Sequence, residues 1–107
     1  MKTNISIKNC ENTIWCNLYA PENYIDKKFP AVIMSHGYNG FADGWDLEGE
    51  YFAKNEIIGF ALDFCGSSKK SRSTGKLTDM TISSECSDLQ CVLEHYQFFW
   101  YEYHLDL

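Results

Sequence analysis

The chain has 107 residues, of which 45% are hydrophobic and 16% aromatic, enough apolar material for one small domain with a buried core. Nine Lys and Arg residues are outnumbered by fifteen Asp and Glu residues, which gives a net charge of -6. Because nucleic acids and anionic membranes both require a basic surface, we expect neither as a partner.

The N-terminal segment and the cysteines predict a cytoplasmic protein. Residues 1–9 lack the apolar centre of about 7 to 15 residues that a secretion signal requires. No later run approaches the roughly 18 apolar residues of a membrane span. The five cysteines are odd in number and form no C-x-x-C pair, which favours reduced thiols over a disulfide framework.

The first 20 residues predict an antiparallel β-hairpin. Apolar residues recur at every second position on both sides of a polar break at residues 9–12, which is typical of half-buried strands. These residues are Ile5, Ile7, Ile14, Cys16 and Leu18. A polar excursion over residues 20–29 follows, and it ends at Pro30, where a new segment begins.

A βαβ unit is expected next. Residues 31–35 and 57–62 are apolar at successive positions, which indicates two parallel strands buried on both faces. Between them we expect a helix over residues 45–55 that is capped by Asp43. The expected inner face of this helix is Leu47, Tyr51 and Phe52.

A polar loop and a second helix complete the predicted domain. The loop carries Lys69, Lys70, Arg72 and Lys76 among serines, and we expect it to be solvated. The helix begins near Thr81, which can cap it, and Glu85 lies in its first turn. Apolar residues follow at helical spacing, at Leu89, Val92, Leu93 and Tyr96.

The segment His36-Gly37-Tyr38-Asn39-Gly40 is the main candidate for chemistry. Glycines at the C-terminal edge of a strand permit backbone angles that leave N–H groups pointing into a crevice, where they stabilise a developing oxyanion. The donor would be the backbone N–H of Tyr38. The alternative, which this motif alone supports equally, is an ordinary glycine-rich turn with His36 beside the core.

Four segments in order, within residues 5–96, resemble the α/β hydrolases of the serine esterase and serine aminopeptidase type. The segments are Leu18-Tyr19-Ala20-Pro21, His36 to Gly40, Asp63-Phe64-Cys65-Gly66-Ser67-Ser68, and Met80-Thr81-Ile82 with Glu85, Asp88 and Leu89. The third departs from the usual Asp-x-x-Gly-x-Gly-x-Ser form, since a serine stands where a second glycine is expected.

The resemblance implies an α/β fold, the truncated N-terminal part of an α/β-hydrolase sheet: an antiparallel hairpin, a βαβ unit and a further helix. It places His36, Gly37 and Gly40 in the oxyanion loop, and the backbone N–H of Tyr38 in the oxyanion hole. In that family a Ser on a Gly-x-Ser-x-Gly elbow, an acid and a His follow in chain order. This chain contains no such elbow, so the resemblance implies that the triad is not present and that neither His36 nor Asp63 belongs to it.

Other kinds of site have little support in the sequence. No spacing favours an alternative triad of Ser67 or Ser68, His95 or His104, and Asp88. The sequence has no His-Glu-x-x-His, no calcium-loop order among its acidic residues 43–50, which we expect to be solvated, and no Walker-type loop. We therefore expect no cofactor and no metal.

The last ten residues differ from the helical pattern before them, with four consecutive aromatics at 98–101. We expect a hydrolase-like portion at residues 1–97 and an atypical aromatic tail at 98–107, which we hypothesise to be out of frame. The alternative is a genuine end of the domain that packs on the sheet.

The functional expectation is a truncated hydrolase, inactive alone, whose intact parent cleaves a small-molecule ester or amide through an acyl-enzyme. The alternative is a noncatalytic interaction module, or one half of a split hydrolase that a second chain completes.

Overall fold

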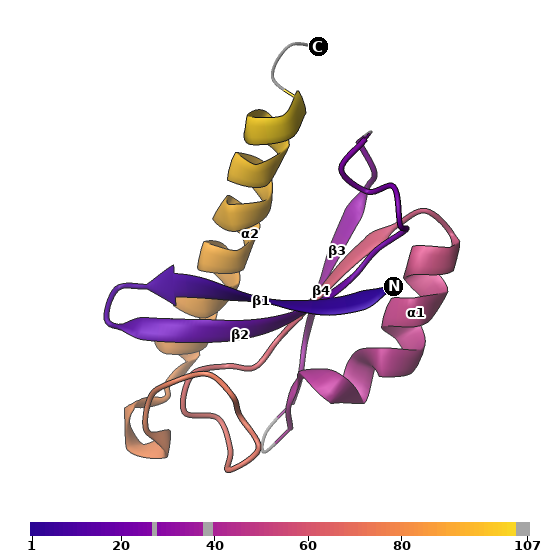
Figure 1. Cartoon of the computed structure of the whole chain (residues 1–107). Coiled ribbons are helices and arrows are strands. Elements are labelled where there is room, and N and C mark those ends of the chain that lie inside the picture. The colour runs from indigo at the N-terminus through magenta and orange to yellow at the C-terminus, as the bar shows by residue number, and fades with distance from the viewer. Residues whose placement is uncertain (27, 38–39, 105–107) are drawn as a thin grey trace.

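The computed structural model describes residues 1–26, 28–37 and 40–104, with side chains up to residue 96. Over these residues the chain forms strands, α-helices and short 3-10 helices (Figure 1). The strands are β1 (Lys2–Asn9), β2 (Asn12–Tyr19), β3 (Ala31–Ser35) and β4 (Ile58–Leu62). The helices are η1 (Ala42–Trp45), α1 (Asp46–Lys54), η2 (Leu77–Asp79) and α2 (Ile82–His104).

The strands form one mixed sheet in the order β1-β2-β4-β3. β1 and β2 form the predicted antiparallel hairpin, in which Ile5 lies opposite Cys16. β4 is antiparallel to β2 and parallel to β3, with Ile33 opposite Phe60. The hairpin, the βαβ unit and the second helix confirm the predicted fold class.

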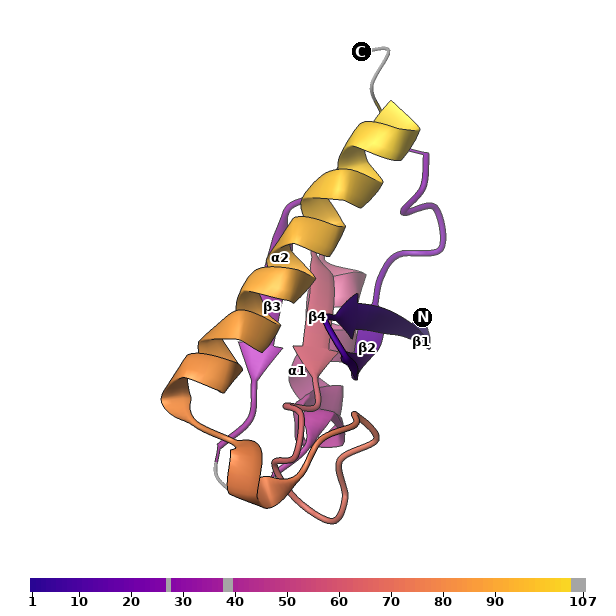
Figure 2. The same cartoon turned by 90° about the vertical axis from the view of Figure 1, so that its left-hand side faces the viewer.

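The two α-helices cover opposite faces of the sheet (Figure 2). Every residue of β4 is buried, because this strand lies inside the sheet and is covered on both faces. The core on the α2 side includes Ile7, Ile14, Leu18, Phe60, Leu62 and Val92. The core on the α1 side consists of Tyr19, Met34, Ala42, Ala53 and Ala61.

The inner face of α1 differs from the prediction. Leu47 and Tyr51 are 81% and 65% exposed, whereas the buried residues of this helix are Gly49 and Ala53. A Cβ at Gly49 would come within 2.5 Å of the ring of Tyr19. The large side chain at this contact is therefore Tyr19 of β2, so α1 presents small residues to the sheet. Of the predicted face, only Phe52 packs against the core.

The predicted cap of α1 is also wrong. Asp43 lies within η1, and the N-cap position of α1 belongs to Trp45, with no side-chain capping hydrogen bond. The carboxylate of Asp43 instead accepts hydrogen bonds from Asn17 and Arg72, at 2.8 Å and 3.0 Å. Long-range partners thus replace the local capping bond.

The start of α2 follows the prediction. The Ser84 N–H donates to Thr81 Oγ1 at 3.0 Å, and the Thr81 N–H donates to Ser84 Oγ at 2.8 Å, so Thr81 caps the helix. Val92 is buried and lies in the core, against which Leu89 and Tyr96 pack. Leu93 is 40% exposed and lies outside this face. The helix continues to His104, across the proposed boundary at residue 97, and the origin of the tail stays a prediction.

The five cysteines are free thiols in the described part of the chain, and Cys16 and Cys65 are buried. Within residues 1–26, 28–37 and 40–104, no helix is long and apolar enough to cross a membrane.

Candidate functional site

The candidate oxyanion turn follows β3 and begins at His36, and the loop after β4 runs from Asp63 to Lys76. The two meet at one edge of the sheet, because the carboxyl ends of parallel strands share an edge. The C-terminal end of β3 and the loop after β4 lie in the lower part of Figure 2. Within the turn, the Gly40 N–H donates to the Gly37 carbonyl at 3.1 Å. Tyr38, whose N–H is the predicted donor, lies outside the described residues.

His36 joins the turn to the end of β4. Its Nε2 accepts the Phe64 N–H at 3.1 Å, and its Nδ1 lies 2.7 Å from the Gly37 carbonyl oxygen. Because a carbonyl can only accept, Nδ1 carries the proton and Nε2 is the unprotonated nitrogen. Both ring nitrogens therefore hold backbone groups in place.

Ser67 lies near His36 without the arrangement of a catalytic pair. Ser67 Oγ is 3.4 Å from His36 Nε2, which already accepts the Phe64 N–H. The side chain of Ser67 is buried at 2% exposure, and a backbone carbonyl occupies the place at Nδ1 that an orienting carboxylate takes in a triad. This pair consequently stabilises the loop and is not set up to attack a substrate.

Among the residues whose side chains the structure describes, the alternative triad is not assembled. Ser68 Oγ donates to a carbonyl in the turn after β3. Asp88 accepts the Cys65 N–H at 2.9 Å, and His95 lines a small apolar cavity. The side chain of His104 lies outside the described part of the molecule.

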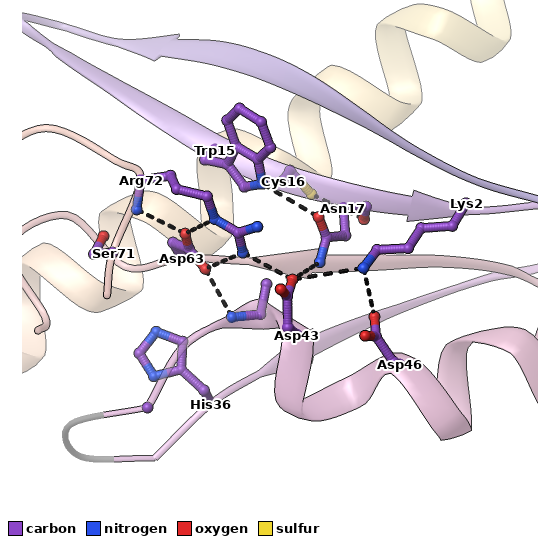
Figure 3. Close-up of polar contacts among 12 residues, drawn as sticks. Lys2, Trp15, Cys16, Asn17, His36, Asp43, Asp46, Asp63, Ser71 and Arg72 are labelled. Atoms are coloured by element: carbon purple, nitrogen blue, oxygen red, sulfur yellow. Dashed lines mark hydrogen bonds and ion pairs between the residues drawn. The ribbon is translucent and has the colours of Figure 1, made fainter. Parts of the chain in front are cut away.

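Asp63 joins η1 to the loop after β4 (Figure 3). Its carboxylate is fully buried and accepts the Ala42 N–H at 2.7 Å. The other carboxylate oxygen accepts both the backbone N–H and the Nε–H of Arg72, each at 2.8 Å. Asp63 thus binds both the segment that follows it and the turn after β3.

Arg72 is an ion-paired residue, where the sequence predicted a solvated loop. Its hydrogen bond to Asp63 raises its pKa against the opposing effect of burial, and Asp43 raises it further. The guanidinium carbon lies 4.9 Å from the centroid of the Trp15 ring. The serines around Arg72 led to the prediction of a solvated loop. The sequence feature that could have identified its role is Asp63, because a carboxylate at the end of a buried strand requires a cation as its partner.

Asp43 and Asp46, which the sequence predicted to be solvated, are also ion-paired. Burial alone would raise the pKa of Asp43, but hydrogen bonds from Asn17 and Arg72 outweigh it and hold this pKa below its usual value. Lys2 Nζ lies 2.8 Å from Asp46, and the hydroxyl of Tyr19 donates to the same carboxylate. Figure 3 shows that these carboxylates point towards β2 and the N-terminal strand.

Two glycines shape the loop after β4. Gly66 and Gly75 have φ angles of 73° and 109°, a region that side-chain-bearing residues rarely adopt. A Cβ at Gly66 would lie 2.4 Å from the Lys76 carbonyl oxygen, so the two ends of the loop are in close contact. Ser67 and Ser68 have negative φ angles, which explains how serine is accommodated where a second glycine was expected.

Within the described ranges, no group of three or more His, Cys, Asp or Glu side chains is placed to hold a metal ion.

Comparison with known proteins identifies the fold. No family model and no curated protein matches the sequence. The α/β hydrolase GrgF from Penicillium sp. sh18 has a TM-score of 0.77 and 18% identity, over 91% of this chain and 32% of that chain. The thioesterase domain from the curacin biosynthetic pathway has a TM-score of 0.74 and 15% identity, over 89% of this chain and 33% of that chain.

A third match is Est1E from Butyrivibrio proteoclasticus with bound ferulic acid, which has a TM-score of 0.71 and 19% identity, over 87% of this chain and 36% of that chain. This chain therefore spans about a third of the length of the solved structures it matches. At these identities the similarity concerns the fold alone. The protein has the fold of the N-terminal part of the α/β hydrolases.

Proposed function

We propose that this chain supplies the oxyanion part of a serine esterase or serine aminopeptidase-like hydrolase, with the Tyr38 N–H as one oxyanion donor. The supporting observation is that His36 and Ala42, which lie on either side of Tyr38 in the sequence, are both bound to the end of β4. His36 Nε2 accepts the Phe64 N–H at 3.1 Å, and Asp63 accepts the Ala42 N–H at 2.7 Å. A donor held in place before the reaction needs no reorganisation when the oxyanion develops.

The proposed reaction is acyl transfer from a small-molecule ester or amide in the cytoplasm. A serine outside these 107 residues transfers its hydroxyl proton to the catalytic histidine as its oxygen attacks the carbonyl carbon, and the carbonyl electron pair moves to the oxygen that faces the Tyr38 N–H. When this electron pair re-forms the carbonyl, the bond to the leaving group breaks and the leaving group takes the proton from the histidine; water then hydrolyses the acyl-enzyme and releases the serine. Because this sequence contains no Gly-x-Ser-x-Gly and Ser67 is buried, we propose that the 107-residue chain alone is inactive.

The test begins with the gene. DNA beyond the Leu107 codon is translated in all three frames, and we expect a Gly-x-Ser-x-Gly followed by Asp and His. The segment that carries it is then coexpressed with this chain, and hydrolysis of 4-nitrophenyl acetate is measured. A Tyr38→Pro variant lacks the N–H and should lose about 10²- to 10³-fold in kcat.

Tyr38→Ala is the matched control, since it retains the N–H and should remain within a few-fold of the unmodified pair. Equal kcat values for the Pro and Ala variants would rule out Tyr38 as the donor. Hydrolysis by the 107-residue chain alone, abolished by Ser67→Ala or Ser68→Ala, would overturn the proposal.

The second candidate function is a noncatalytic interaction module, or a half-hydrolase that binds a second chain. The observation that favours it is the position of β3 at the edge of the described sheet. An edge strand presents unpaired N–H and C=O groups to which another strand can be added. Mixing this chain with the coexpressed segment should slow amide exchange at residues 31–35. Unchanged exchange there on mixing would contradict pairing at this edge.

A further inference from the structure

A hollow of about 340 Å³ opens beside the candidate oxyanion turn. His36 borders it on the side of the turn, and Phe41 and Trp45 supply aromatic surface. Lys70, from the loop after β4, completes the lining. This volume lies in the range of small-molecule pockets, and its place at the carboxyl end of a parallel strand is where open α/β sheets bind ligands.

Lys70 is the unpaired cation of this hollow. Its Nζ lies 5.4 Å from the centroid of the Phe41 ring, and none of the described carboxylates lies within ion-pairing distance of it. Arg72 lies near the same ring, with its guanidinium carbon 5.5 Å from the centroid, but Asp63 and Asp43 pair with its charge. An anion that enters the hollow would therefore meet one free positive charge.

The nearby acidic side chains leave this charge uncompensated. Asp43 and Asp46 belong to the same segment as Phe41 and Trp45, but neither lines the hollow. Their carboxylates bind Arg72 and Lys2 on the side of β2, as Figure 3 shows. In a chain of net charge -6, the hollow thus combines aromatic walls with a local positive charge.

We propose that this hollow binds one end of the substrate, and that this end is a flat unsaturated group with a carboxylate that pairs with Lys70 Nζ. The aromatic walls fit the planar part, and the single ammonium fits a single negative charge. The inference rests on the proposed hydrolase function, because the position beside the oxyanion turn is what makes the bound group part of a substrate.

Binding to the 107-residue chain tests the proposal without any need for turnover. Benzoate is titrated while the amide signals of Gly40, Gly44 and Trp45 are followed by NMR. We expect saturable shifts with a Kd on the order of 1 mM, as for a small fragment with one charge contact. Benzamide, which has the same shape and no charge, should bind at least fivefold more weakly.

Matched variants separate the role of Lys70 from a general electrostatic attraction of benzoate to nearby lysines. Lys70→Gln should weaken benzoate binding about fivefold and leave benzamide binding unchanged, and Lys70→Arg should restore it. Lys69→Gln removes a neighbouring exposed lysine that does not line the hollow, and it should have no effect. All these side chains are exposed, so the fold should be retained, which the dispersion of the NMR spectrum verifies.

Equal binding of benzoate and benzamide, or equal losses in the Lys69 and Lys70 variants, would overturn the carboxylate subsite. Failure of the proposed function gives a different result. If benzoate binding depends on Lys70 but the coexpressed pair shows no hydrolysis, the carboxylate-binding site is supported and its role in binding an ester or amide substrate is contradicted.

Discussion

At the residue scale, Asp63 determines how the loop after β4 folds onto the sheet. Its carboxylate is fully buried and accepts hydrogen bonds from the loop that follows it, through Arg72, and from the turn after β3, through Ala42. Removing one partner of a buried ion pair costs more than the pair contributes, because the remaining charge is left without compensation. Asp63 therefore controls both the loop and the turn that carries the candidate oxyanion donor.

Replacing this carboxylate should destabilise the fold strongly. Asp63→Asn should lower the free energy of unfolding by about 3 kcal/mol, since the amide cannot neutralise Arg72 and presents N–H donors to other donors. Urea unfolding followed by circular dichroism measures the change. Asp26→Asn, at an exposed carboxylate, should stay within about 0.5 kcal/mol. Equal stabilities of the two variants would contradict this role.

Gly66 should tolerate no side chain. Gly66→Ala places a Cβ 2.4 Å from the Lys76 carbonyl oxygen at a φ of 73°, so the strain of the left-handed region adds to a backbone clash. We expect a loss of at least about 1 to 2 kcal/mol in the free energy of unfolding. Gly44→Ala is the control, because a Cβ there meets no atom within 4 Å. A neutral Gly66→Ala would show that the loop does not close against Lys76.

At the element scale, α2 is the helix whose start is set by local sequence. Thr81→Ala removes the oxygen that accepts the Ser84 N–H at 3.0 Å, and should lower the free energy of unfolding by about 1 kcal/mol. Amide exchange in the first turn of the helix should accelerate in parallel. Ser83→Ala alters an exposed neighbour and should have little effect. Unchanged exchange in Thr81→Ala would mean that tertiary packing alone holds the helix end.

The two helices differ in how far the sequence predicts them. Thr81, Leu89, Val92 and Tyr96 follow local rules of capping and periodicity, and the structure confirms them. For α1 the large residues Leu47 and Tyr51 suggested the wrong face. The packing of this helix depends on the ring of Tyr19 from a distant strand, which local periodicity does not reveal.

At the scale of the whole molecule, the buried cysteine thiols should make the folded state less stable at alkaline pH. Burial raises the pKa of the Cys16 thiol from 9.0 to about 12, and the charge of Asp63 adds to this shift. Burial likewise raises the pKa of Cys65 from 9.0 to about 12, with Asp88 as a further cause. A raised folded pKa means that the stabilisation is complete below the unfolded value and is lost as the pH rises through the folded value.

We therefore expect the urea midpoint, measured with a reducing agent, to fall steadily between pH 9 and about 12. A Cys16→Ala/Cys65→Ala double variant should show a shallower fall over the same window. Cys86→Ala, at an exposed thiol, should keep the full dependence. Parallel pH profiles for the double variant and the unmodified chain would show that these thiols are not the source.

The sequence by itself determined the hairpin, the two buried strands, the capped start of α2 and the fold class, because alternation, apolar runs and capping are local patterns. The second of these strands was predicted at 57–62 and lies at Ile58–Leu62. It also located the turn at His36, whose Tyr38 donor stays a prediction. Only the tertiary structure decided the partners of Asp43, Asp63 and Arg72 and the small-residue face of α1. These contacts join different segments of the chain, and their geometry exists only once the sheet has brought those segments together.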